Sequence, residues 1–236
     1  MIYNEVASND LFIESLQGER NKVQTFLKEN PGMKVIDVGG AMGSWAEPRV
    51  DAYLDINATQ YLSKTEALLF DGNLSDPEGY DSVLKHVEEH GKFDFAICTQ
   101  TLEDIRNPSF VLDMLPKIAK KGYIDVPSKY HEFRITELPQ PLSDWGLTQY
   151  NRGYTGHRWI MNMFEGVFEM YPKLPFVFNI AALDYLKVDE PEPLEKGMLC
   201  FWWKDSIEWK IVGDDFLGPN PPSVYKMYSE GLKKGL

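Results

Sequence analysis

Short apolar segments alternate with amphipathic segments through the first half of the chain. The apolar segments are rich in Val, Ile, Leu and Phe and have the length of buried strands; they are residues 33–38, 52–56, 67–72, 93–99 and 122–126. Helices are predicted at residues 8–29, 75–91 and 107–122. Strands that alternate with helices form a parallel sheet whose two faces are covered by the helices. The sequence therefore predicts an α/β fold.

The alternation stops beyond Pro127 and resumes near the C-terminus. Residues 128–175 are rich in proline and aromatic residues and are too short to bury a core of their own, so we expect an insertion, a lid, on one domain that spans residues 1–236. Further strands are predicted at residues 176–183, 198–203 and 207–212. Because only a short polar turn separates the last two, we expect them to form a C-terminal antiparallel hairpin.

Charge and composition exclude several classes of protein. The chain has 24 Lys and Arg against 36 Asp and Glu, and a net charge of −12 opposes binding to nucleic acid or to an anionic membrane. No uncharged apolar stretch is long enough to span a bilayer and the N-terminus lacks a signal-peptide pattern, so we expect a cytoplasmic protein. Cys98 and Cys200 are too few for a disulfide framework or a thiolate metal site. Nothing in the sequence indicates an oligomeric state.

Polar and glycine residues follow the predicted strands at their carboxyl ends. They are Asp37 and Gly39, Asp55, Asp71 and Gly72, Thr99 and Gln100, and Asp125. In an open parallel sheet, ligands bind at this edge. Each residue taken alone is more often a helix cap or a turn residue, but together they predict a polar crevice.

The first strand leads into a glycine-dense turn, VIDVGGAMGSW at residues 35–45. Glycine allows a positive φ and a close approach of the backbone to another group, and a helix that begins after the turn offers free N–H groups to a ligand. A tight corner without a ligand is the alternative. A nicotinamide-binding turn is a rival interpretation, but its glycine spacing requires a glycine in place of Val38.

Four motifs follow one another in this half of the chain: Asp37-x-Gly39-x-x-x-Gly43, Asp55 at the second strand end, Asp71-Gly72, and FDFAICTQTLEDIRNPSFVLDMLPKIAKKGYIDVP. In this order they resemble class I S-adenosylmethionine-dependent methyltransferases of the type 11 kind, and the resemblance covers about residues 33–127. It implies a Rossmann-like fold with a mostly parallel seven-stranded sheet and helices on both faces. It also implies S-adenosylmethionine as the cofactor.

The resemblance assigns a role to each motif. The expected cofactor-binding residues are Asp37, Gly39 and Gly43 for the methionine part, Asp55 for the ribose hydroxyls, Asp71 and Gly72 for the adenine amine, and Thr99 and Gln100 at the fourth strand end. Hydroxyls and an exocyclic amine are hydrogen-bond donors, and carboxylates are their natural acceptors.

The sequence departs from the family pattern in two places. Ala41 replaces the middle glycine of the turn, and only 12 positions separate Gly43 from Asp55, so the first crossover helix must be short or irregular. The Leu-Glu-His that usually follows the fourth strand is Leu-Glu-Asp at residues 102–104. A cofactor-binding module without catalysis therefore stays among the possible functions.

The acceptor side is predicted from the segments PSKYHEF, RGYTGHRWI and FWWKDSIEWKIV. They are similar to a subgroup of methyltransferases found beside glycan-building enzymes, including virus-encoded members, which implies methyl transfer to a hydroxyl of a sugar or glycan. Aromatic faces and directional hydrogen bonds suit a sugar. The expected substrate-binding residues are His131, Tyr154, Arg158 and Trp159. The alternative is that the aromatic side chains only pack the lid.

Transfer to an alcohol needs a base, because a hydroxyl is a poor nucleophile at neutral pH. Imidazole titrates closest to that pH, so His157 is the first candidate, with a structural hydrogen bond as its alternative. Glu132 could orient the other ring nitrogen, and Asp125, a carboxylate in an apolar strand, is a second candidate base. Asp125 and Glu132 could instead hold Mg²⁺ with a third oxygen ligand, although no spacing demands a metal.

Three functions follow from these observations. A sugar or glycan O-methyltransferase is favoured. A methyltransferase for another small molecule is the second, and a non-catalytic module that binds S-adenosylmethionine is the third.

Overall fold

A seven-stranded sheet forms the centre of the computed structural model, in the order β1-β11-β6-β5-β2-β3-β4. The structure describes residues 11–12, 16–40, 45–47, 49–61, 65–137, 150–154, 156–186, 197–213 and 221–234. The strands are β1 (Leu11–Phe12), β2 (Val35–Val38), β3 (Ala52–Asp55), β4 (Leu68–Asp71), β5 (Phe95–Thr99), β6 (Lys121–Pro127) and β11 (Met198–Lys204). The strands from β6 to β4 are parallel, whereas β11 runs antiparallel to both of its neighbours. The predicted α/β fold with a mostly parallel sheet is confirmed.

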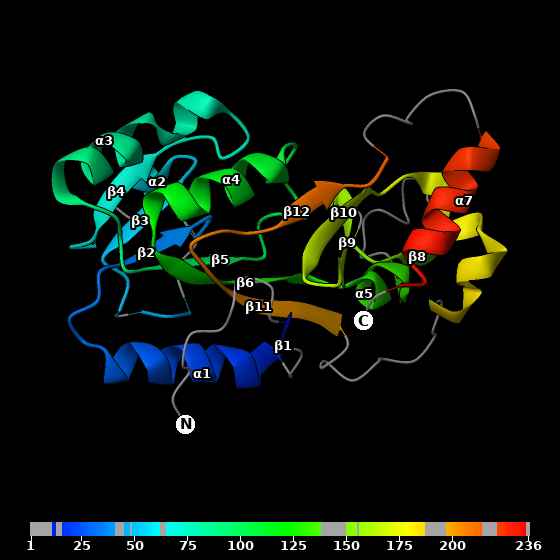
Figure 1. Cartoon of the computed structure of the whole chain (residues 1–236), viewed down its shortest axis with the longest axis horizontal. Coiled ribbons are helices and arrows are strands. Elements are labelled where there is room, and N and C mark those ends of the chain that lie inside the picture. Colours follow the sequence, from blue (N-terminus) through cyan, green and yellow to red (C-terminus); the bar gives the residue numbers. More distant parts are fainter. Residues whose placement is uncertain are drawn as a thin grey trace.

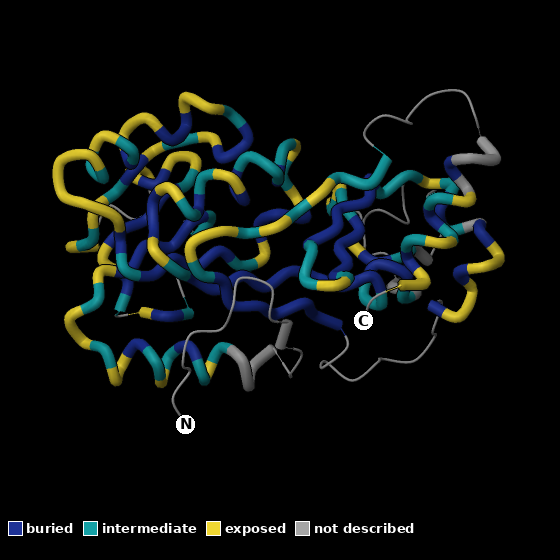
Figure 2. The backbone as a smooth tube through the Cα atoms, viewed as in Figure 1, coloured by how far each residue is buried: buried dark blue, intermediate teal, exposed yellow. Residues whose placement is uncertain are grey.

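Helices cover both faces of this sheet, as predicted (Figure 1). Helix α1 (Leu16–Glu29) lies on one face, and α3 (Asp81–His90) and α4 (Pro108–Ile118) lie on the other. Side chains alternate along a strand, so β5 sends Phe95 and Ile97 toward α1 and sends Ala96 and Cys98 toward α4. Figure 2 shows the result, a buried sheet with exposed residues on the outer helices and loops.

Short helices connect the strands near the predicted crevice. Helix α2 (Ala58–Tyr61) follows β3, and the 3₁₀ helix η1 (Pro77–Tyr80) precedes α3. Among the described residues between β2 and β3, none is helical, which agrees with the short spacing between the two strands.

A second group of elements continues the molecule beyond β6 and lies at the right of Figure 1. It contains a three-stranded sheet of β9 (Trp159–Phe164), β10 (Val167–Pro172) and β12 (Trp209–Ile211), and a pair of β7 (Ile135–Glu137) with β8 (Tyr150–Arg152). The helices here are α5 (Lys129–Phe133), η3 (Pro175–Asn179), η4 (Ala181–Leu186) and α7 (Pro221–Gly231).

The predicted insertion therefore has regular structure and packs onto the sheet. Met161, Met163 and Phe168 from β9 and β10 are buried in the same cluster as Leu199 and Phe201 of β11. Residues farther along, from η3, η4 and α7, form a separate buried cluster with Phe133 of α5. The segment 128–175 thus joins two hydrophobic clusters, and its function as a lid stays a prediction.

The predicted C-terminal hairpin is wrong. Both edges of β11 are occupied, by β6 and by β1, and β12 pairs instead with β10 in parallel. Only an isolated bridge between Lys204 and Ser206 joins the two segments, around Asp205 with φ +63°. The chain therefore turns out of one sheet and enters another.

The strand predicted at residues 176–183 is also wrong. This apolar run forms the 3₁₀ helices η3 and η4, and Val177, Ile180 and Leu183 recur every three residues on the buried side. A short apolar run does not by itself distinguish a strand from a buried helix.

Two smaller predictions concern the cysteines and the membrane. Cys98 and Cys200 are both buried in the sheet, and neither forms a disulfide. No helix in the described ranges combines the length and the apolar character needed to cross a bilayer.

Candidate functional site

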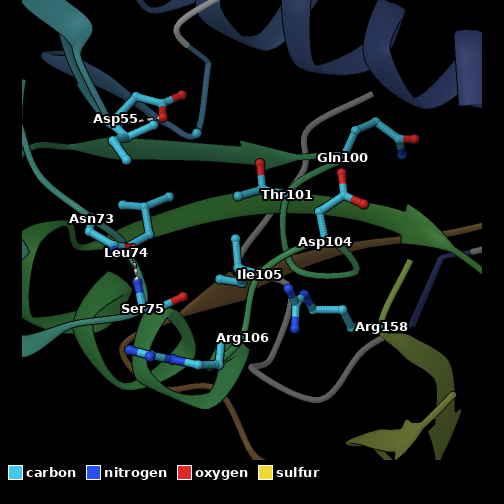
Figure 3. Close-up of a pocket in the computed structure, with 12 residues that line it drawn as sticks. Asp55, Asn73, Leu74, Ser75, Gln100, Thr101, Asp104, Ile105, Arg106 and Arg158 are labelled. Atoms are coloured by element: carbon cyan, nitrogen blue, oxygen red, sulfur yellow. Dashed lines mark hydrogen bonds between the residues drawn. The ribbon is translucent and has the colours of Figure 1, made fainter. Parts of the chain in front are cut away.

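A cavity of about 360 Å³ opens at the carboxyl ends of β2 to β5 (Figure 3). We call Gly39, Asp55, Ile56 and residues 73–75 its strand-end side. The facing wall contains Gln100, Thr101, Asp104, Ile105, Arg106 and Arg158. A crevice at this edge of the sheet is where the strand ends predicted it.

Glycines allow the backbone to close tightly over the ends of β2 and β5. Gly39 has φ +90°, and a Cβ there would lie 2.3 Å from Thr101 Oγ1. A Cβ on Gly40 would lie 2.4 Å from Cγ of Asp37. The Asp37 side chain is therefore buried beneath the turn and does not line the cavity, whereas Gly39 does. Gly43 lies outside the described residues.

Asp55 ends β3 and lines the cavity, as predicted (Figure 3). Its Oδ1 accepts a hydrogen bond from the backbone N–H of Ile56 at 2.5 Å. The Ile56 side chain is 56% exposed, so apolar surface lies next to the carboxylate at the cavity wall. This pair offers hydrogen-bond acceptors and an apolar contact to one ligand.

The Asp71 side chain, at the end of β4, accepts hydrogen bonds from within the protein. Its carboxylate accepts from the Thr59 backbone N–H at 2.9 Å and from Thr59 Oγ1 at 2.6 Å, and these bonds lower the pKa of Asp71. Gly72 packs against the backbone of Gly79, where a Cβ would lie 1.9 Å from the carbonyl oxygen. Neither Asp71 nor Gly72 lines the cavity.

Residues 73–75 line the cavity in their place, and the sequence interpretation missed them. Asn73 Oδ1 accepts from the Ser75 backbone N–H at 3.0 Å, and Asn73 Nδ2 donates to Asp76 at 2.7 Å. An asparagine that bonds the backbone two residues on makes a compact turn. The available signal was their position directly after a strand end.

The two predicted residues at the end of β5, Thr99 and Gln100, are hydrogen-bonded to other side chains. Thr99 Oγ1 accepts from Trp45 Nε1 at 3.2 Å. Gln100 lines the cavity with φ +51°, and its Nε2 donates to Asp125 Oδ1 at 3.1 Å. The strand ends of β5 and β6 are thus joined through this amide.

Asp125 is fully buried and paired. Arg20 of α1 binds it with both arms of the guanidinium, Nε to Oδ2 at 2.9 Å and a terminal nitrogen to Oδ1 at 3.0 Å. Both oxygens of this carboxylate therefore already accept charge-assisted hydrogen bonds within the protein. This pairing joins α1 to β6.

Three of the predicted acceptor-side residues meet in a second polar group with Lys173, which was not predicted. We call this group, formed by Glu132, Tyr154, His157 and Lys173, the Glu132 cluster. Glu132 Oε1 lies 2.5 Å from His157 Nδ1, as expected for a residue that orients the imidazole. The other ring nitrogen, Nε2, lies 3.8 Å from Asp104 Oδ1 at the cavity wall. His157 therefore lies between a buried carboxylate and Asp104 of the cavity wall, although His157 itself does not line the cavity.

The short helix that carries Glu132 is anchored at its start. Lys129 Nζ donates to the carbonyl oxygens of Leu232 and Lys234 at 2.9 and 2.8 Å. These carbonyls lie just beyond the end of α7, so the chain that follows the C-terminal helix fixes the helix that carries Glu132.

Tyr154 lies between two histidines. Its ring stacks on His131 at 5.0 Å and meets His157 at 4.8 Å, and 55% of the residue is exposed. Burial lowers the pKa of His131, which favours a neutral ring. His131 Nε2 is buried and has no hydrogen-bond partner among the described residues.

Arg158 and Trp159 attach the start of β9 to the loop after β5. The Arg158 backbone N–H donates to Glu103 O at 2.7 Å, and Trp159 Nε1 donates to Ile105 O at 2.9 Å. The Arg158 side chain extends into the cavity toward Ile105 (Figure 3). These contacts place the segment around His157 beside the cavity.

Glu103 is a buried acid to which the sequence interpretation gave no role. It is 1% exposed, and its Oε2 has no hydrogen-bond partner in the described part of the chain. Burial raises the pKa of Glu103 to about 8, and the nearby carboxylates of Asp104, Asp125 and Glu132 add to the rise. The departure from Leu-Glu-His at residues 102–104 pointed to this loop without indicating the burial.

The carboxylates considered for Mg²⁺ have protein partners. Asp125 is bound by Arg20, and Glu132 is bound by His157 and Lys173. Within the ranges that the structure describes, no group of three or more His, Cys, Asp or Glu side chains is arranged to hold a metal ion.

A family model described as methyltransferase domain matches residues 15–164, which is more than half of the chain. The chain belongs to this methyltransferase family. The match extends beyond the parallel strands to the end of β9, and so includes Glu132 and His157. A search of curated proteins finds no match.

Several solved structures are similar to this methyltransferase. The N-terminal domain of EvdMO1 with SAH bound is 15% identical with a TM-score of 0.34, and the match covers 61% of this chain and 65% of that one. The methyltransferase domain of bacterial CtHen1-CN is 13% identical with a TM-score of 0.41, and the match covers 80% of this chain and 99% of that one. WbdD is 18% identical with a TM-score of 0.35, and the match covers 50% of this chain and 30% of that one. The chain spans 65% of the EvdMO1 domain and 19% of the small RNA methyltransferase HEN1. At these TM-scores the likenesses do not bear on the acceptor.

The cofactor of the methyltransferase is S-adenosylmethionine, and the strand-end side fits it. Asp55 presents a carboxylate beside the exposed Ile56, which suits hydroxyls on an apolar ring. Asn73 and Ser75 add polar groups on the same wall, and Gly39 removes side-chain bulk where the backbone turns. These residues would hold the nucleoside part, and the cavity continues toward Asp104 and Arg158.

Proposed function

We propose that the chain is an O-methyltransferase that transfers a methyl group from S-adenosylmethionine to a hydroxyl of a sugar or glycan. The observation that carries this proposal is the contact between Glu132 Oε1 and His157 Nδ1, 2.5 Å, with His157 Nε2 turned to the cavity wall at Asp104. A carboxylate on one ring nitrogen fixes the tautomer and leaves the other nitrogen as a proton acceptor.

The chemistry assigned to the cluster is proton removal. S-adenosylmethionine supplies a methyl group made reactive by its positively charged sulfur. His157 Nε2 takes the proton of the acceptor hydroxyl as the methyl group is transferred, and Glu132 stabilises the imidazolium that forms through the hydrogen bond to Nδ1. Asp125 is the alternative base, although its carboxylate is held by Arg20.

A sugar is favoured as the acceptor by the side chains around His157. Tyr154 offers an exposed aromatic face, and Arg158 and Asp104 offer charged hydrogen-bonding groups within reach of the same cavity. His131 and Trp159 hold this surface in place through the Tyr154 stack and the bond to Ile105. The net charge of −12 opposes an RNA acceptor.

The lid is part of the same proposal. Segment 128–175 supplies Glu132, Tyr154, His157 and Arg158, and its backbone bonds to the loop after β5 hold it against the cavity. Covering the acceptor in this way excludes water from the transferred methyl group.

We also propose a cytoplasmic location.

The proposal is tested with His157→Ala and, as a control, His90→Ala on the outside of α3, where His90 is half exposed. His157→Ala should lower turnover by about 10²–10⁴-fold, the usual scale for a positioned proton acceptor. Calorimetry with S-adenosylhomocysteine should give an affinity close to wild type for both variants. Glycosides screened by mass spectrometry for the added mass of a methyl group provide the acceptor.

Specific results contradict the proposal. If His157→Ala retains nearly full turnover while Asp125→Asn abolishes it, the base is Asp125. If the wild type binds S-adenosylhomocysteine and methylates only non-sugar small molecules, the acceptor class is wrong. Binding without methylation of any acceptor in the screen favours the non-catalytic module.

A further inference from the structure

Lys173 is a buried cation at the centre of the Glu132 cluster, and it follows β10 directly. Its Nζ lies 2.5 Å from Glu132 Oε2, and the exposed fractions of the two side chains are 6% and 0%. The opposite oxygen of the same carboxylate binds His157. One carboxylate therefore joins an ammonium group to an imidazole, with each partner on a different oxygen.

Lys173 also holds the backbone around this carboxylate. Its Nζ donates to Tyr154 O at 2.7 Å, and its backbone N–H donates to Arg158 O at 2.8 Å. Gly153 has φ +57°, and a Cβ there would lie 2.5 Å from Glu132 Oε2. The glycine lets the chain pass close enough for the Tyr154 carbonyl to reach the ammonium group. The segment from Gly153 to Arg158 is thus fixed on both sides of His157.

The ammonium group of Lys173 places a positive charge against the carboxylate that also binds His157. A fully buried carboxylate with only a histidine beside it is favoured in its neutral form by desolvation. A positive charge at 2.5 Å favours the anion instead. A charged carboxylate can only accept a hydrogen bond from Nδ1–H of the imidazole, which leaves Nε2, 3.8 Å from Asp104 Oδ1, as the ring nitrogen on the side of the cavity wall.

We propose that Lys173 is a positioning residue of the methyl transfer: it keeps Glu132 ionised and so fixes the tautomer and orientation of His157. This inference rests on the proposed function, because it assigns no contact between Lys173 and a substrate. It adds a residue of the predicted lid that lies outside the three segments from which the acceptor side was predicted.

The test compares Lys173→Met with Lys173→Arg. Methionine keeps most of the length and removes the charge, whereas arginine keeps the charge. Lys210→Met is the control for loss of a lysine that is half exposed: Lys210 of β12 binds Glu169 of β10, another acid of low exposure, at 2.8 Å. Turnover, KM for the acceptor, affinity for S-adenosylhomocysteine and the pH dependence of turnover are measured for each.

Lys173→Met should lower turnover by about 10-fold to 100-fold, the scale found for partners that orient a functional histidine. Affinity for S-adenosylhomocysteine should not change, and Lys173→Arg should restore most of the turnover. The acid limb of the pH profile should move to higher pH, because loss of a cation makes protonation of the pair easier. The other charged or titratable groups near the pair are His131, Arg134, Glu103 and Asp104, and they are unchanged in every variant.

A structural role alone predicts a different pattern. It predicts lower thermal stability with a normal turnover per folded molecule and an unshifted pH profile, and that result overturns the proposal. If His157→Ala is inactive while Lys173→Met matches wild type, the Lys173 inference fails and the proposed function stands. If His157→Ala is fully active, the proposed function itself has failed.

A second measurement covers the case in which Lys173→Met does not fold. The chain has only four histidines, so ¹⁵N NMR of the ring nitrogens of the wild type can be assigned with His157→Gln. A proton on Nδ1 of His157 is expected in the ligand-free protein near neutral pH. A proton on Nε2 with a bare Nδ1 contradicts the proposal.

Discussion

The strand-end side of the cavity and the Glu132 cluster differ in what holds their polar groups. On the strand-end side, Asp55 and Asn73 follow parallel strands and bond to backbone N–H groups one and two residues away. In the Glu132 cluster, the hydrogen bonds join residues 25 and 41 positions apart, and the shared carboxylate has no exposed surface. The first group is local and near solvent, whereas the second is buried and built from three separate parts of the chain.

This difference predicts how each side responds to substitution. A carboxylate near solvent can be removed with little effect on folding, so its loss should appear mainly in ligand binding. A buried carboxylate that neutralises a buried lysine cannot be removed without leaving the cation unpaired. Stability and turnover should therefore change together in the Glu132 cluster and separately on the strand-end side.

The largest effect on stability is expected for Glu132→Ala. The substitution leaves Lys173 buried without its carboxylate and should lower the free energy of unfolding by about 3–5 kcal/mol. Urea unfolding measures the change, with Asp104→Ala as the control because the Asp104 side chain is 55% exposed. Equal stabilities for Glu132→Ala and wild type would falsify the description of this cluster as a buried ion pair.

Asp55→Ala should weaken cofactor binding and leave the free energy of unfolding nearly unchanged. We expect S-adenosylhomocysteine to bind more weakly by about 1.5–3 kcal/mol, the range for hydrogen bonds to a charged group, as measured by calorimetry. Asp71→Ala is the comparison, because the Asp71 carboxylate binds Thr59 and does not line the cavity. Weakening by Asp71→Ala as large as that by Asp55→Ala shows that Asp71 also binds the cofactor, as the family resemblance implies.

Gly153→Ala tests how closely the backbone must approach Glu132. The methyl group meets Glu132 in a backbone conformation with φ +57°, so the free energy of unfolding should fall by about 1–3 kcal/mol beyond the cost of the positive φ itself. Gly91→Ala is the comparison for a positive φ in open space, since Gly91 has φ +82° and ψ 168° with no atom within 4 Å of a Cβ. If the two variants lose the same stability, the approach of Gly153 to Glu132 is not tight.

The effect that is smallest for each pH unit is a pH dependence of stability from Glu103. The pKa of Glu103 in the folded protein, about 8, lies above the ordinary value of 4.5. Below pH 4.5 the acid is neutral in both the folded and the unfolded chain, and as the pH rises toward 8 ionisation favours the unfolded chain, so the free energy of unfolding falls. Glutamine does not ionise. The free energy of unfolding of Glu103→Gln should therefore rise relative to that of the wild type by about 1 kcal/mol per pH unit across this window. Thermal unfolding at pH 5, 6 and 7 measures the difference. A constant difference across these pH values contradicts the burial of an acid in its neutral form.

Local pattern predicted much of the fold and the place of the site. Apolar runs of strand length, separated by helical segments, are enough to predict a parallel sheet, and side-chain alternation then buries both faces of β5. The carboxyl ends of such strands share one edge, which is why Gly39, Asp55 and Gln100 line the cavity as expected. These features depend on periods of two to four residues, which a sequence displays directly.

Partner choice over long separations was not predictable in the same way. Asp125 is held by Arg20, 105 positions away, and the segment expected to pair with β11 in a hairpin pairs with β10 instead. Asp71 looked equivalent to Asp55 in the sequence, yet a threonine of α2 takes up its carboxylate.

Local sequence was enough to predict the alternation of strands and helices, the glycine turn and the edge of the sheet at which the cavity opens. The acids that face the cavity and those that bind cations became clear in the folded chain, which also brings Lys173 to Glu132 and His157. Strands and turns form from residues that are neighbours in the sequence, whereas a buried carboxylate is paired with whichever cation the packing of distant segments places beside it.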